Sequence, residues 1–193
     1  MLEELKTLIN LHPVTSNQNA VSALLDYVEA KLAAKGLVTE RIIHKGIHSL
    51  YASTHGQKHA RVMLQGHVDV VPGGEEFHMD GDKIYGRGSF DMLFGVASFL
   101  THIEQLENPT DYDLSVLLTG DEEVGGRNGV YEILNTERYT CDVCILPDGG
   151  DRLGRAEVQA DPRAAGVARG VVGRQAAVGG GLGRRDGSGR RIG

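Results

Sequence analysis

The chain has 193 residues, of which 40% are hydrophobic and 24% charged, and this balance is typical of one soluble globular domain rather than a disordered chain. No apolar run approaches the roughly 18 residues that a membrane span needs, and the N-terminus lacks the basic start and apolar middle of a signal peptide. We therefore expect a cytoplasmic protein that does not enter a membrane.

Two helices are predicted at the N-terminus. Leucine and isoleucine recur at helical spacing over residues 2–9, and a second apolar face runs through residues 21–32. Ser16 or Asn17 can cap the start of the second helix, and Gly36 can end it.

Strand-like and helical segments alternate through the next hundred residues. Apolar or β-rich runs predict strands at 40–44, 50–54, 61–65, 114–119 and 142–147, and helical spacing predicts helices at 91–107 and 127–138. This alternation predicts an α/β fold whose sheet is mostly parallel and is flanked by helices.

The composition changes sharply near Asp151. Residues 1–151 carry a net charge of −12 and residues 152–193 a net charge of +6, and 27 of the last 42 residues are Gly, Arg or Ala. Glycine occupies 11 of those 42 positions, so the backbone is costly to order. We expect 1–151 to be the folded unit and 152–193 to be a disordered or non-native tail.

Two origins of this tail remain open. Gly, Arg, Ala and Pro are encoded by GC-rich codons, so a shifted reading frame near Asp151 explains the composition. The alternative is a basic tail that binds RNA, but the segment has no aromatic residue to stack on bases. We therefore expect no nucleic-acid partner.

The only cysteines are Cys141 and Cys144, which provide no disulfide framework. Both fall within or beside a predicted buried strand, where positions three apart point to opposite faces. We therefore favour core packing for both side chains over a zinc site or a redox pair.

Residues able to bind or serve a metal lie where predicted elements end or begin. The carboxyl ends of parallel strands line one crevice, so residues that are distant in sequence converge there. Three strands are followed by such groups, and a further acid begins the third helix. The candidates are His67, Asp69, Asp91, Glu122, Glu123 and Asp148.

The spacing of these residues suggests which of them bind a metal and which serve as supporting or catalytic groups. His67 and Asp69 are two apart in an extended segment, so one can bind a metal while the other orients it; the alternative is a surface hydrogen bond. Glu122 and Glu123 are adjacent, which favours one metal ligand and one base for a water between two cations. The alternative is an exposed acidic loop, although acids crowded at one edge would repel one another without cations.

Four motifs, in this order, resemble the di-zinc metallopeptidase family that includes aminoacylase, acetylornithine deacetylase, succinyl-diaminopimelate desuccinylase and carboxypeptidase G. They are Gly-His-Val-Asp-Val-Val-Pro at 66–72, Tyr-Gly-Arg-Gly at 85–88 followed by Asp91-Met92, Asp-Glu-Glu at 121–123 and Pro-Asp-Gly-Gly at 147–150. The resemblance implies an incomplete catalytic domain of the zinc-exopeptidase type over residues 1–151.

The resemblance also implies a role for each candidate. His67 and Asp148 would bind one zinc, Asp91 would bridge both zinc ions and Glu123 would bind the other. Cobalt or manganese would also suit these donors.

The remaining two candidates would serve the reaction rather than the metal. Asp69 would orient His67, and Glu122 would be the general acid/base. A bridging water would attack the amide carbonyl of an N-acyl amino acid or small peptide.

The chain also departs from the family pattern. Leu93 and Phe94 stand where the family usually has Lys and Gly, and all eight histidines lie at or before His102, whereas the family completes its second zinc site with a late His. The inserted dimerisation domain is not recognisable. We therefore expect an incomplete second metal site, an inactive chain and no oligomer.

Two alternatives belong to other functional classes. The chain could be a non-catalytic metal-binding fragment, or an interaction module with a basic tail. A dinucleotide-binding fold is not supported, because Gly86-Arg87-Gly88 does not continue as the G-x-G-x-x-G motif that opens a helix.

Overall fold

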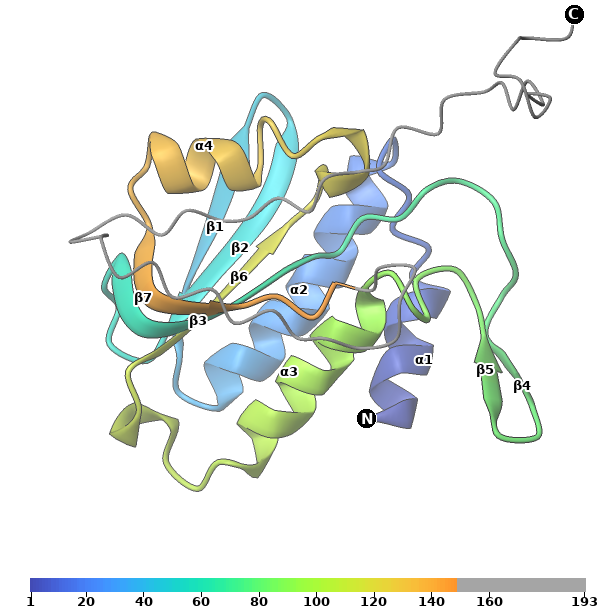
Figure 1. Cartoon of the computed structure of the whole chain (residues 1–193), viewed down its shortest axis with the longest axis horizontal. Coiled ribbons are helices and arrows are strands. Elements are labelled where there is room, and N and C mark those ends of the chain that lie inside the picture. Colours follow the sequence, from blue (N-terminus) through green and yellow to red (C-terminus); the bar gives the residue numbers. More distant parts are fainter. Residues whose placement is uncertain (149–193) are drawn as a thin grey trace, which may run out of the picture.

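The structure, a computed structural model, describes residues 1–148. Its centre is a five-stranded sheet in the order β1-β2-β6-β3-β7 (Figure 1). The strands are β1 (Val38–His44), β2 (Ile47–Ser53), β3 (His59–His67), β6 (Leu114–Thr119) and β7 (Thr140–Ile145).

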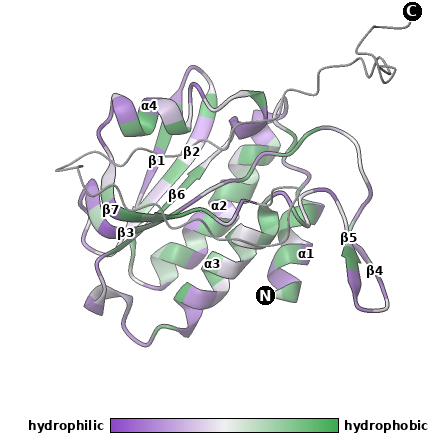
Figure 2. Ribbon diagram, viewed as in Figure 1, coloured by the Kyte–Doolittle hydropathy of each residue, from purple (hydrophilic) through white to green (hydrophobic). Residues whose placement is uncertain are grey.

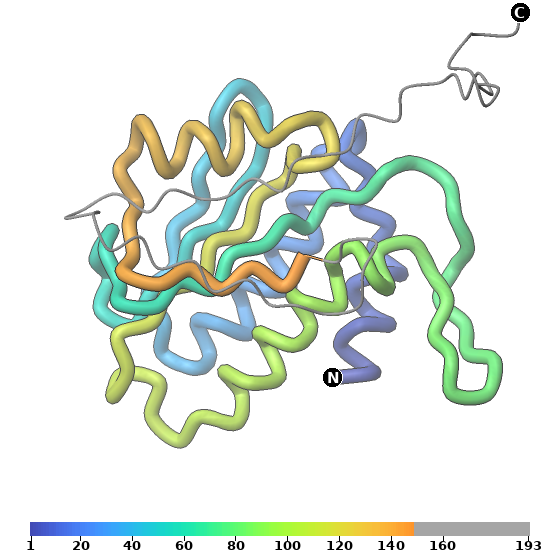
Figure 3. The backbone as a smooth tube through the Cα atoms, in the orientation of Figure 1, coloured from blue at the N-terminus to red at the C-terminus, as the bar shows by residue number. Residues whose placement is uncertain are grey.

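The sheet is mixed but mostly parallel. β1 pairs with β2 and β2 with β6 in antiparallel ladders, whereas β3 pairs with both β6 and β7 in parallel. Four of the five strands therefore point the same way, and only β2 is reversed. Figure 3 shows the orange β7 running beside the teal β3, although the two strands are far apart in sequence. The predicted α/β class is confirmed.

One face of the sheet is covered by three helices, α1 (Leu2–Asn10), α2 (Gln18–Ala34) and α3 (Leu93–Gln105). Their apolar faces join alternate residues of β2 and β6 in the larger core cluster, which includes Leu50 and Leu118. Figure 2 shows hydrophobic residues along the central strands and on α2 and α3.

The opposite face is covered less completely. α4 (Val130–Asn135) places Ile133 against Tyr51, Leu117 and Tyr139 in a smaller cluster. Because Leu117 lies between Val116 and Leu118 on β6, the alternation of a strand divides the two clusters between its faces.

The helix boundaries follow the predictions with two differences. The Asn17 side chain accepts a hydrogen bond from the Ala20 N–H at the start of α2, as predicted. The predicted helix at 127–138 is only α4, because the buried carboxylate of Asp121 accepts hydrogen bonds from the Asn128 and Gly129 N–H groups and holds that segment in a turn.

The second difference is that α3 begins at Leu93 rather than at Asp91. An additional antiparallel hairpin, β4 (His78–Asp80) and β5 (Lys83–Tyr85), was not predicted and projects from the body (Figure 1). Two single turns of 3-10 helix are η1 (Pro109–Asp111) and η2 (Glu122–Val124). The tail predicted at 152–193 lies outside the described residues.

Both cysteines lie in β7 and pack against the smaller cluster, so the predicted core packing is confirmed. The prediction that they point to opposite faces is wrong, because both side chains pack into the same smaller cluster. Side chains of strands lean along the strand, and this allows both cysteines to reach that cluster from β7.

No helix within residues 1–148 is both long and apolar enough to cross a membrane.

Truncating the centre of the larger cluster is expected to be costly. Leu118 is fully buried on β6, so Leu118→Ala should lower the free energy of unfolding by about 2–5 kcal/mol, through lost burial and the cavity left behind. Ile43 is 61% exposed, and Ile43→Ala should change it by less than about 0.5 kcal/mol. Urea unfolding followed by circular dichroism measures both; equal losses would contradict this placement of the core.

Candidate metal centre

The ends of three neighbouring strands converge at one edge of the sheet. β3 ends at His67, β6 leads into η2 with Glu122 and Glu123, and β7 leads to Asp148. Because β6, β3 and β7 are adjacent and parallel, their carboxyl ends lie together. The predicted convergence of these segments is confirmed.

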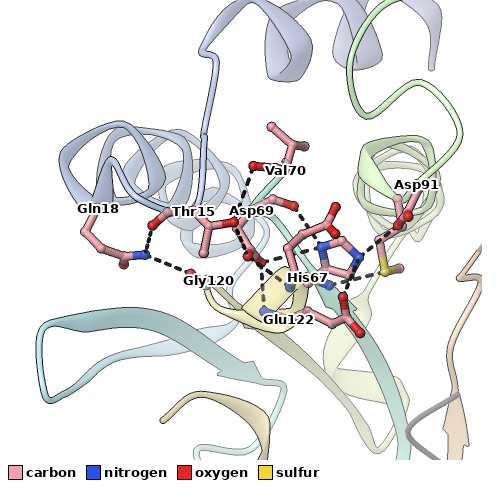
Figure 4. Close-up of polar contacts among 10 residues, drawn as sticks. Thr15, Gln18, His67, Asp69, Val70, Asp91, Gly120 and Glu122 are labelled. Atoms are coloured by element: carbon pink, nitrogen blue, oxygen red, sulfur yellow. Dashed lines mark hydrogen bonds and ion pairs between the residues drawn. The ribbon is translucent and has the colours of Figure 1, made fainter. Parts of the chain in front are cut away.

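Three of the candidates form a compact cluster of donor atoms. His67, Asp91 and Glu123 each offer one atom, and these atoms all lie within 4.8 Å of one another. The Nε2 atom of His67 is 3.0 Å from Oδ1 of Asp91 and 3.8 Å from Oε2 of Glu122 (Figure 4). One imidazole nitrogen therefore faces carboxylates from the segment that precedes α3 and from η2.

Asp148 lies beside this cluster rather than within it. The proximity of Asp148 helps to lower the pKa of Asp91, and the charge of His67 lowers the pKa of Asp148. Asp148 therefore reaches the same group of side chains from the end of β7.

Asp69 is completely buried beneath the cluster. The His67 Nδ1 atom is 2.8 Å from the Asp69 backbone carbonyl and 3.5 Å from its Oδ1, so the carbonyl is the nearer partner. The carboxylate instead accepts hydrogen bonds from the N–H groups of Glu122 and Glu123, at 3.1 and 3.3 Å. Asp69 thus joins the end of β3 to η2.

Close packing holds the backbone at the end of β3. The His67 N–H points to the Met92 sulfur at 3.2 Å, and a Cβ atom on Gly66 would lie 2.7 Å from the Met92 methyl carbon. Glycine is therefore required before His67 unless Met92 moves. The peptide bond between Asp91 and Met92 is cis.

The imidazole of His67 is held in its charged form. Burial lowers the pKa of His67, but hydrogen bonds with Asp69 and Asp91, and the charges of Asp69 and Glu122, outweigh this effect and raise the pKa to about 11. In turn, the hydrogen bond to His67 is the main reason that the pKa of Asp91 is lowered.

The other three acids of the site have raised pKa values. Burial is the main cause that raises the pKa of Glu122, Glu123 and Asp148, and negative neighbours raise it further. Divalent cations stabilise the ionised form of acids that are buried together in this way. An imidazole with carboxylates suits zinc, cobalt or manganese. The residues present therefore fit a metal site.

Zinc binding to the metal-free chain is expected to release about one proton at about pH 8, because a ligating His67 must be neutral. The pKa is raised from 6.5 to about 11, so His67 remains charged between these values. Its contribution to the stability of the metal-free fold is full below pH 6.5 and is lost as the pH rises towards 11. Calorimetry in buffers of different ionisation enthalpy counts the proton; a heat that is independent of the buffer would contradict this assignment.

Three residues that support the site were not predicted from the sequence. The Thr15 hydroxyl donates to Asp69, and the Gln18 side chain donates to the Gly120 carbonyl (Figure 4). Neither residue lies in a motif that the sequence analysis used, so no local signal revealed them. Asp121 was inside a motif, and its burial beneath the turn at 128–129 could be read only from the structure.

A cavity of about 150 Å³ lies beside the end of β3 but does not contain the site. Its lining residues are Ile9, His12, Val14, Val70, Gly73, Gly74, Glu75 and Arg87, so none of the six candidates borders it within the described part of the chain. Ligand pockets usually have about 300–1,000 Å³, so this cavity, as bounded by residues 1–148, is smaller than a usual ligand pocket.

Solved structures with the same fold include two hydrolases. The M20 family metallo-carboxypeptidase of Sulfolobus solfataricus matches with a TM-score of 0.58 at 23% identity, covering 78% of this chain and 38% of that one. Human carnosine dipeptidase 1 matches with a TM-score of 0.62 at 18% identity, covering 76% of this chain and 38% of that one. These likenesses establish the fold.

Sequence comparison extends the likeness beyond the fold. The succinyl-diaminopimelate desuccinylase of Dinoroseobacter shibae is 32% identical over 164 residues, which are 76% of this chain and 42% of that protein. The same enzyme of Sulfurimonas denitrificans is 35% identical over 132 residues, which are 65% of this chain and 34% of that protein. The chain thus spans about two fifths or less of the length of these relatives.

A family model gives the assignment. The model of peptidase family M20/M25/M40 matches residues 63–167 and so continues past residue 151, where the sequence analysis placed the end of the folded unit. The matched range contains all six candidate residues of the site. Because the matched range also includes more than half of the 193 residues of the chain, the chain belongs to peptidase family M20/M25/M40.

Proposed function

We propose that this chain carries the metal-binding part of a hydrolase that cleaves the amide bond of N-acyl amino acids or small peptides. The observation that carries the proposal is the cluster of His67, Asp91 and Glu123 donor atoms within 4.8 Å, with Glu122 beside it. The desuccinylases named above are relatives whose substrate contains such an acyl amide.

Two divalent cations would share the proposed ligands. His67, Asp91 and Asp148 would hold the first, and Asp91 and Glu123 the second, with zinc the preferred ion and cobalt or manganese possible. When bound, such cations polarise a carbonyl and make water acidic near neutral pH.

Glu122 is proposed as the general acid/base. It lies next to His67 without belonging to the compact donor cluster, and burial raises the pKa of its carboxyl group. A raised pKa suits a carboxylate that accepts a proton from water and later returns it to the leaving amine. Asp69 is proposed to keep both His67 and the backbone of η2 in place.

The second cation is proposed to bind more weakly than the first. Residues 1–148 offer a histidine and two carboxylates to the first cation, but only Asp91 and Glu123 to the second. Two carboxylates leave most of a zinc coordination shell to water. We therefore propose that this chain by itself hydrolyses amides slowly or not at all, and the alternative function is a non-catalytic metal-binding fragment.

The remaining expectations are also proposals. Residues 1–151 are proposed to be a partial catalytic domain, and the chain is proposed to be cytoplasmic and monomeric without nucleic acid or membrane partners.

Cobalt titration followed by an amide hydrolysis assay tests the function. The metal-free chain should bind one cobalt ion tightly and a second at least about tenfold more weakly, since ligand number sets the affinity. Turnover of N-acetyl and N-succinyl amino acids by the loaded chain would support the hydrolase. Metal binding without turnover would support the fragment, and binding that is equally tight in His67→Ala would rule out both.

A further inference from the structure

A short segment before α2 is attached to the end of β3. Val14 forms an isolated parallel bridge with Val70, the Thr15 N–H donates to the Val70 carbonyl at 3.1 Å, and the Val70 N–H donates to the Pro13 carbonyl at 3.0 Å. These backbone bonds place the Thr15 side chain beside Asp69 (Figure 4).

Gln18, the first residue of α2, fixes this segment to two strands. Its Nε2 group donates to the carbonyls of Thr15 at 2.9 Å and Gly120 at 2.8 Å, and its Oε1 accepts from the His48 N–H at 3.0 Å. The Thr15 backbone is therefore tied to β2 and to the residue that follows β6.

The Thr15 hydroxyl completes the shell of donors around Asp69. It donates to Oδ2 at 2.8 Å, and the same oxygen accepts from the Glu123 N–H while Oδ1 accepts from the Glu122 N–H. Asp69 is 0% exposed, so its charge is stabilised by these donors and by His67, whose Nδ1 lies 3.5 Å from Oδ1, rather than by water. Removal of one donor should make the carboxylate turn towards those that remain.

η2 depends on this carboxylate. The first N–H groups of a helical turn have no partner inside the turn, and the preceding Asp121 does not cap them with its side chain in the described part of the chain. Asp69 supplies the missing acceptors from the end of β3. The placement of both glutamates thus follows the orientation of one buried carboxylate.

We propose that Thr15 is a positioning residue for Glu122 and Glu123: its hydroxyl fixes the Asp69 carboxylate, which in turn fixes the backbone of η2. The link consists of contacts between protein groups, whereas its consequence for chemistry rests on the function proposed above.

Amide hydrogen exchange tests the link in the metal-free, ¹⁵N-labelled full chain. Thr15→Val, which keeps the branched shape but removes the hydroxyl, should speed exchange at Glu122 and Glu123 by about tenfold or more. Thr15→Ser should stay within about twofold of the wild type because it keeps the donor. Thr15→Ala, which removes the hydroxyl without adding a methyl group, is the second test variant.

Thr54 provides the matched control. Its buried hydroxyl donates to the Tyr112 carbonyl at 2.8 Å, so Thr54→Val also loses a buried hydrogen bond. Thr54→Val should not speed amide exchange selectively at η2. Exchange at the two glutamates that is unchanged in Thr15→Val, that is equally fast in Thr15→Ser, or that is equally fast in Thr54→Val would overturn the proposal.

Cobalt affinity and the visible spectrum of bound cobalt give a second measure. Thr15→Val should weaken binding by about tenfold and change the spectrum, whereas Thr15→Ser should restore both, because partners of ligand-orienting groups have effects of this size. If the wild-type chain bound no cobalt, the proposed function would fail, while amide exchange would still decide the role of Thr15.

Discussion

Asp91→Asn is expected to weaken binding of the first cobalt ion by more than about 100-fold, since losing a partner of a ligand alone costs about 10–100-fold. Asp91 lies 3.0 Å from the His67 Nε2 atom and belongs to the compact donor cluster, and the nearby Asp148 helps to lower its pKa. In the proposal it contributes to both cations, so one substitution should remove both. Isothermal titration with cobalt measures the loss.

Asp82→Asn is the matched control for this prediction. Asp82 is an exposed acid in the turn between β4 and β5, and its substitution makes the same change in charge. Cobalt affinity should stay within about twofold of the wild type. Equal losses in the two variants would mean that net charge, rather than ligation, governs binding.

Glu122→Gln should separate metal binding from chemistry. The substitution keeps the shape of the side chain but removes the carboxylate that would accept a proton, so any amide hydrolysis by the cobalt-loaded chain should fall by about 10²–10⁴-fold. Cobalt affinity should change little, because Glu122 lies outside the compact donor cluster. Initial rates on N-succinyl and N-acetyl amino acids, measured at saturating cobalt, provide the comparison.

The exposed Glu107 supplies the control for the second prediction. Glu107→Gln should hydrolyse the same substrates at the wild-type rate within about twofold. Undiminished hydrolysis by Glu122→Gln would exclude Glu122 as the proton acceptor, and loss of cobalt from this variant would make it a ligand instead.

The sequence predicted the parts of the fold that depend on local periodicity. The central strand β6 was predicted with its observed bounds, and the apolar spacing predicted α2 and α3 to within a few residues. Periodicity did not predict the segments whose backbone conformation is set by tertiary contacts. The buried Asp121 carboxylate shortens α4, and the strands β4 and β5 have only three residues each, too few to show a clear alternation of polar and apolar residues.

The candidate site was predictable to a similar extent. The rule that parallel strands end at one edge placed His67, Glu123 and Asp148 together before any contact was known. It could not show that Asp69 holds η2 through backbone N–H groups, since that contact joins positions more than 50 residues apart. The same rule could not predict the role of Thr15, because the Thr15 hydroxyl contacts Asp69 only in the folded chain.

The most direct test of the central claim is the position of bound zinc. An anomalous difference map at the zinc absorption edge, from crystals of the zinc-loaded full chain, should show a peak about 2.0–2.2 Å from the Nε2 atom of His67 and from a carboxylate oxygen of Asp91. Zinc bound only at Cys141 and Cys144, or only at surface histidines, with His67 still hydrogen-bonded to Asp91, would contradict the account.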